Sequence, residues 1–192
     1  MATRILLSLV LAAVCAATVW AGFEEGITAY ERGDYATTLN EWRPLAEQGD
    51  PTAQYHMGWL YVIGRGVPQD YQEAVRWFRK AAEQGDRDAQ ANLGSLYLLG
   101  DSLPQDYTEP LKWFRAAADQ GHSLAQTKLG IMYEDGEGVP QDRVHAHMWF
   151  SLAAGQGSEL AGAFRNEVTK QMTPAQIAEA QRLAREWKPK GK

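Results

Sequence analysis

The histidines are the first side chains in this sequence that could do chemistry, because imidazole binds metals and transfers protons near neutral pH. His145 and His147 are two positions apart in an expected helix, where side chains at this spacing point to different faces. They therefore cannot bind one metal as an i, i+4 pair does. His147 stands where the other repeats have apolar residues, which predicts a partly buried side chain, whereas His56 is expected at the surface. The spacing predicts no metal ligands.

Carboxylates gather in one segment, Glu134-Asp135-Gly136-Glu137-Gly138. Their spacing departs from the alternating ligands of an EF-hand loop, so the segment is interpreted as a solvated turn. The sequence contains no Gly-x-Ser-x-Gly elbow, no Walker loop and no His-Glu-x-x-His motif. We therefore expect no catalytic residues, no cofactor and no enzymatic activity.

A 36-residue repeat supplies the elements that must position any binding site. Three consecutive units cover residues 49–84, 85–120 and 121–156, and fourteen of the 36 positions are identical in all three. In the first unit these positions are Gly49, Ala53, Gln54, Gly58, Tyr61, Gly64, Pro68, Gln69, Asp70, Trp77, Phe78, Ala81, Ala82 and Gln84. Self-similarity at this period is typical of stacked helical repeats, in which neighbouring units bury a shared core.

Each unit is expected to form two helices. Gly58 lies inside the first helix, where glycine costs up to about 1 kcal/mol relative to alanine, so its recurrence predicts a close helix crossing. Gly64 is expected to end that helix. Asp70 is a natural N-cap for the second helix, as are Asp106 and Asp142 in the later units.

The repeat pattern weakens at both ends of the array. Residues 22–48 match a half-repeat that would cap the N-terminal end, and residues 157–187 match a degenerate repeat followed by a capping helix. Thr173 and Pro174 mark the start of that last helix. Residues 188–192 form a basic tail. Degenerate end units cover the apolar faces that a stacked array would otherwise expose.

The candidates for partner binding are positions at which the residue differs between units although the surrounding residues are the same. In the first unit these are Tyr55, His56 and Trp59, which fall on the face opposite the repeated apolar residues. Equivalent positions of the next two units extend the predicted protein-binding surface with Asn92, Ser95, Lys128 and Ile131. Because Tyr and Trp are frequent interface hot spots, Tyr55, His56 and Trp59 are predicted to anchor the partner. The open alternative is that Tyr55 and Trp59 pack against the N-terminal half-repeat.

The repeated residues resemble the Sel1-like repeat family, relatives of the tetratricopeptide repeats with a slightly longer unit. The resemblance rests on Ala53-Gln54, Gly58, Tyr61, Gly64, the run from Gly66 to Tyr71, Ala74, Trp77-Phe78, Ala81-Ala82 and Gln84-Gly85, and it recurs through Gln156. It implies an all-α fold, a right-handed α-solenoid of antiparallel helix pairs. It also implies that the concave face, lined by the first helices, binds another protein or a peptide.

Residues 1–21 have the pattern of a secretory signal peptide. Arg4 precedes an apolar run, and small residues lead to a predicted cleavage after Ala21. Cleavage would remove Cys15 and place the mature chain in the periplasm or outside the cell. The open alternative is an uncleaved membrane anchor. Membrane contact is otherwise expected only through this segment before cleavage.

Composition narrows the class of partner. The chain has 192 residues, with 24 Asp and Glu against 19 Lys and Arg, and a net charge of −5. Nucleic-acid binding needs a basic face, so no nucleic-acid partner is expected. The resemblance to the Sel1-like repeats, together with the predicted signal peptide, implies an exported adaptor or scaffold of the bacterial envelope. The alternative is a cell-wall enzyme or glycan binder related to β-lactams or peptidoglycan, although the cysteine-rich branch of the family linked to β-lactams carries paired cysteines that the mature chain lacks.

Overall fold

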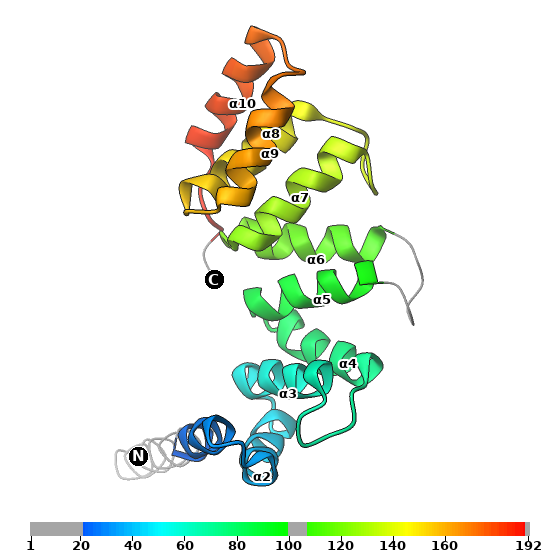
Figure 1. Cartoon of the computed structure of the whole chain (residues 1–192), viewed down its shortest axis with the longest axis vertical. Helices are drawn as coiled ribbons and strands as arrows, with labels where there is room; N and C mark the ends of the chain where they lie inside the picture. Colours follow the sequence, from blue (N-terminus) through cyan, green and yellow to red (C-terminus); the bar gives the residue numbers. More distant parts are fainter. Residues whose placement is uncertain (1–20, 100–106, 191–192) are drawn as a thin grey trace, which may run out of the picture. The chain divides into compact units, whose positions relative to one another are not determined.

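The computed structural model describes residues 21–99 and 107–190, and the regular structure in these stretches is helical. A helical segment at residues 21–31 comes first. The following helices are α2 (Tyr35–Glu47), α3 (Pro51–Ile63), α4 (Tyr71–Glu83), α5 (Arg87–Leu99), α6 (Thr108–Asp119), α7 (Ser123–Asp135), α8 (Arg143–Gly155), α9 (Glu159–Thr169) and α10 (Pro174–Glu186) (Figure 1). Except for Ala21, the predicted signal segment lies outside the described residues.

The chain divides into two compact units, residues 1–81 and 82–192, and each is described by itself. In the N-terminal unit, α2 packs on α3. In the C-terminal unit, α5 packs on α6, α6 on α7, α7 on α8, and α8 on both α9 and α10. Helices that pack in chain order form an α-solenoid, so the predicted all-α solenoid fold is confirmed. Within the described stretches, no helix is both long and apolar enough to cross a bilayer.

Side-chain caps set where the repeat helices begin. Asp50 accepts the N–H of Ala53 at 2.7 Å to start α3, and the same register holds Asp86, His122 and Ser158 in the later units. The second helices begin at aspartates, as predicted: Asp70 and Asp142 each accept two backbone N–H groups. Asp106, the third predicted cap, lies outside the described residues.

Glycine allows an aromatic ring to approach the middle of each first helix. A Cβ on Gly58 would lie 2.7 Å from the Phe78 ring, and the equivalent distances are 2.9 Å for Gly94 to Phe114 and 2.5 Å for Gly130 to Phe150. All three phenylalanines are buried. The predicted close crossing is confirmed, and the group that needs the space is the phenylalanine of the second helix.

Buried glutamines tie the repeats together. Gln54 donates to the carbonyl of Ala46 at 3.0 Å, and Gln90 and Gln126 make the same bond to the carbonyls of Ala82 and Ala118. In the C-terminal unit, Gln120 also donates to Gln90 at 2.9 Å, and Gln156 donates to Gln126 at 2.7 Å. An unpaired buried amide costs about 1–3 kcal/mol, which explains why both glutamine positions recur in the sequence.

The C-terminal end is covered by α10. Thr173 and Gln176 form the capping box that starts this helix, with Pro174 in the first turn, as predicted. Trp187 then packs edge-on against Trp149, with ring centroids 6.2 Å apart. The described part of the basic tail continues to Lys190, whose ammonium lies 2.6 Å from the Asp119 carboxylate.

Candidate binding site

A pocket of about 510 Å³ lies in the N-terminal unit between the helical segment 21–31, α2 and α3. Its floor is apolar and closed, because Trp42 is 2% exposed and Leu60 is 1% exposed. The segment 21–31 lies directly on Trp42: a Cβ on Gly26 would overlap the indole ring. Trp42 also donates its indole N–H to the Phe23 carbonyl at 3.2 Å. The indole therefore fixes the segment against α2.

One wall of the pocket comes from the segment 21–31. Ile27 and Tyr30 line it, and the Tyr30 ring stacks on Trp42 with centroids 5.9 Å apart. Tyr30 also contacts Tyr35 edge-on at 5.6 Å, which holds the ring from a second side. This wall is therefore built from rings that contact one another.

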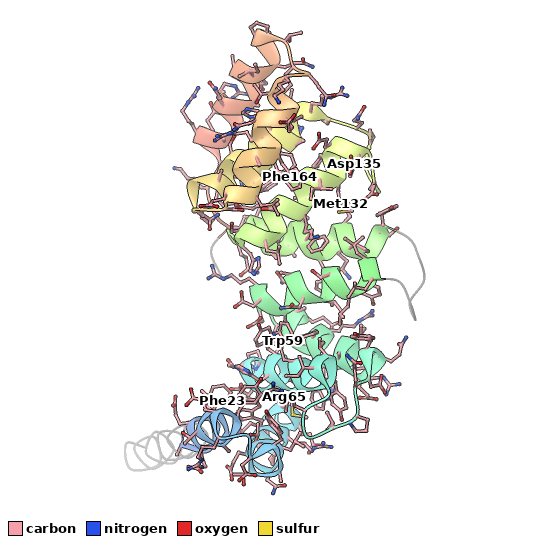
Figure 2. All side chains as sticks on the ribbon, in the orientation of Figure 1. Phe23, Trp59, Arg65, Met132, Asp135 and Phe164 are labelled. Atoms are coloured by element: carbon pink, nitrogen blue, oxygen red, sulfur yellow. The ribbon has the colours of Figure 1, made fainter. Side chains whose placement is uncertain are left out.

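The opposite wall is formed by α3 and holds all three predicted anchor residues. Tyr55, His56 and Trp59 line the same pocket, and each is half-buried. The Trp59 indole N–H donates to the Tyr55 hydroxyl at 2.7 Å, which is the i, i+4 spacing of one helix face. Figure 2 labels Trp59 on α3 and Phe23 on the segment 21–31, the two elements that carry the opposite walls.

His56 is not the surface residue that was predicted. Its ring lies 4.7 Å from Trp42 and 5.3 Å from Phe23, so it packs onto the N-terminal half-repeat. Tyr55 and Trp59 instead contact the buried Phe78 of α4, at 5.7 and 6.2 Å. Packing against the N-terminal half-repeat was the alternative for Tyr55 and Trp59. These ring contacts show it more directly for His56 than for Tyr55 or Trp59.

Glu31 and Ile63 are the most exposed residues that line the pocket. Ile63 is 39% exposed at the end of α3, and Glu31 is exposed at the end of the segment 21–31. Among the described residues, no cation pairs with Glu31. The pocket thus combines aromatic walls with a solvent-facing carboxylate.

The other four predicted residues lie in the C-terminal unit and are half-buried. Asn92 and Ser95 donate to carbonyls of their own helix, Asp88 at 2.8 Å and Ala91 at 2.9 Å. Ile131 packs against a small core that includes Phe150. A continuous surface of these residues with Tyr55, His56 and Trp59 stays a prediction.

The sequence reasoning missed the wall and floor that face α3. Ile27, Tyr30 and Glu31 have the i, i+3, i+4 spacing of one helix face, which was the available signal. The segment matches the other repeats only as a short, degenerate first helix, so a comparison of repeats could not single these residues out. Trp42 stands 36 residues before Phe78, at the equivalent position of the half-repeat.

The remaining histidines have structural roles. His147 is 4% exposed, and burial, with the nearby Arg165, lowers its pKa below the ordinary value. His122 caps α7 through Nδ1, and its Nε2 lies 3.2 Å from Asp88 of α5. Burial lowers the pKa of His122 as well, against the opposing effect of Asp88. In the described part of the chain, no three His, Cys, Asp or Glu side chains are grouped as a metal site would require.

Comparison with known proteins relates this geometry to a family. The Sel1 repeat model matches residues 51–86, 87–122 and 123–158, two residues out of phase with the units defined above. A Sel1 repeat protein from Oxalobacter formigenes is 35% identical, with a TM-score of 0.69 over 73% of this chain. The protective antigen c5321 of uropathogenic Escherichia coli, which has an SLR fold, is 31% identical, with a TM-score of 0.53 over 88% of this chain.

This chain spans only part of either structure: 58% of the Oxalobacter protein and 45% of the antigen. A comparison with curated proteins gave no match. Sel1 repeats generally mediate protein–protein interaction and are generally non-catalytic.

Proposed function

Because the chain belongs to the Sel1 repeat family, we propose that it is a non-enzymatic, exported adaptor that binds a protein or peptide partner in the bacterial envelope. The observation that carries this proposal is the aromatic pocket between the segment 21–31, α2 and α3. The pocket of the N-terminal unit is the contact site.

Size and composition of the pocket support a binding role. Its volume of about 510 Å³ lies within the range of ligand sites. Tyr55 and Trp59 are residue types that often dominate binding energy, because they offer a large rigid surface with few rotatable bonds. Trp42 and Leu60 are buried beneath the pocket, and rigid side chains of this kind lose little freedom when a partner binds.

Export rests on the first 21 residues. Arg4, the apolar run and the small residues before Gly22 support recognition as a signal peptide. Mass spectrometry of the protein purified from its native cell tests this: the expected N-terminus is Gly22. A full-length chain found in the membrane fraction would favour the uncleaved anchor.

The adaptor role is tested by a crosslinking pull-down from envelope extract with matched variants. Ile63→Lys places a positive charge in the pocket at a residue that is already 39% exposed, so the fold should persist. It is a milder change than replacing Tyr55 and Trp59 together, which would take two rings away from the buried Phe78. Leu160→Lys is the control, because this α9 residue is also an exposed leucine-sized side chain and lies outside the pocket.

We expect wild type and the Leu160 variant to capture the same protein and the Ile63 variant to lose it. Equal capture by all three would refute the pocket as the contact site. If no variant captures a protein, the cell-wall alternative is assayed directly, by turnover of a chromogenic β-lactam and by binding to peptidoglycan.

A further inference from the structure

We infer that the pocket of the N-terminal unit takes an arginine side chain from a basic peptide segment of the partner. This inference rests on the proposed adaptor function and names the chemistry of the partner. Two independent features of the pocket support it: half-buried aromatic side chains on both walls and the exposed carboxylate of Glu31.

Aromatic rings come from both sides of the pocket. Tyr30 stands on one wall, and Tyr55 and Trp59 stand on the other. The faces of such rings carry partial negative charge and attract cations, most strongly for tryptophan. Arginine is the cation best suited to this lining, because its planar guanidinium stacks on rings and is only weakly hydrated. Its aliphatic stem can lie against Ile27 and Ile63, which keep exposed surface in the pocket.

Charge around the pocket has the sign that an arginine requires. Glu31 lines the pocket from the exposed end of the segment 21–31, where no described cation neutralises it. The segment 21–31, α2 and α3 together carry five glutamates and one arginine, Arg43. Opposite charge at a binding site steers the encounter and selects the partner.

The inference is tested with immobilised peptide libraries of random sequence and one fixed central residue. The fixed residue is arginine, citrulline or norleucine; citrulline has the shape of arginine without its charge, and norleucine keeps only the apolar stem. The protein is the chain from Gly22, as wild type and as the variants Glu31→Gln and Trp59→Phe. Glu159→Gln is the charge-matched control, because Glu159 is exposed on α9 and does not line the pocket.

We expect the wild type and the Glu159 variant to capture the arginine library several-fold more than the citrulline and norleucine libraries. Glu31→Gln should lower arginine capture by up to about fivefold, the upper end of the range for an exposed ion pair. Trp59→Phe should weaken arginine capture more than norleucine capture, because phenylalanine attracts cations less well.

Other results would overturn the inference in distinguishable ways. Equal capture of the arginine and citrulline libraries would refute the cationic partner, while the adaptor function would still stand on the pull-down. Loss of arginine preference in the Glu159 variant would show that general charge, and not the pocket, selects the peptide. If the pull-down depends on Ile63 but no library is captured above norleucine, the pocket binds an apolar group instead.

Discussion

Gly130→Ala should destabilise this protein, although replacing glycine by alanine within an open helix usually stabilises it. A Cβ at residue 130 would lie 2.5 Å from Cε1 and 2.6 Å from Cδ1 of Phe150. Carbon atoms in ordinary contact are about 3.5–4.0 Å apart, so the ring would have to move by about 1 Å. Phe150 is 0% exposed and contacts Phe164 at 5.4 Å, which leaves the ring little room to move.

Two opposing effects determine the size of the change. Alanine gains about 1 kcal/mol over glycine in a helix interior. Overpacking a close-packed core costs about 1–3 kcal/mol. The net expectation is a loss of about 1 kcal/mol in the free energy of unfolding. Gly162→Ala is the matched control, because the nearest atom to its new Cβ would be 3.9 Å away, and it should gain up to about 1 kcal/mol. The two variants should therefore differ by about 2 kcal/mol.

Urea unfolding of the chain from Gly22, followed by far-UV circular dichroism, measures both variants against the wild type. The slopes of the unfolding curves must agree before the midpoints are compared, because repeat arrays can lose cooperativity. Adding Phe150→Leu to Gly130→Ala should recover part of the loss relative to the sum of the single changes. If Gly130→Ala stabilises the protein as much as Gly162→Ala, the close-approach argument for all three repeated glycines is refuted.

Two further predictions concern the histidines. Burial lowers the pKa of His122 and His147 below 6.5, so the unfolded chain binds more protons than the folded one as pH falls through 6.5. The free energy of unfolding should therefore fall on acidification from pH 7 toward 5, and His147→Gln should flatten this slope; an unchanged slope would contradict the assignment. His145 stands where the previous repeat has Glu109, which accepts the indole N–H of Trp113 at 2.7 Å, and the buried indole N–H of Trp149 has no acceptor within the described stretches. His145→Gln should supply one through its amide oxygen without placing a second carboxylate beside Asp142, which His145 contacts at 2.6 Å, and should stabilise the protein by about 1 kcal/mol in urea unfolding, a gain that Trp149→Phe should abolish.

Much of the fold was predictable because its signals are local or repeated. The caps at Asp70 and Asp142 and the helix end at Gly64 depend on atoms within a few residues along the chain. The space beside Gly58 depends on Phe78, which lies in the same 36-residue unit, so both positions recur together. In the third unit, His145 replaces the glutamate that accepts the tryptophan indole N–H in the second unit. That the indole N–H of Trp149 is buried without an acceptor became visible only in the structure.

The candidate site was predictable only in part, for a physical reason. Tyr55, His56 and Trp59 vary at positions where the repeats otherwise agree, and one helix face is enough to bring them together. The facing wall depends on how the segment 21–31 lies across α2, and that follows from the contact of Gly26 with Trp42, sixteen residues further along the chain. In this degenerate first helix, Gly26 does not stand at the position of Gly58, so the approach could not be inferred from the repeat. The repeated sequence by itself therefore determined the stacked helix pairs. Only the tertiary packing of the segment 21–31 on α2 and α3 determined that an aromatic pocket forms there, with the exposed Glu31 in its lining.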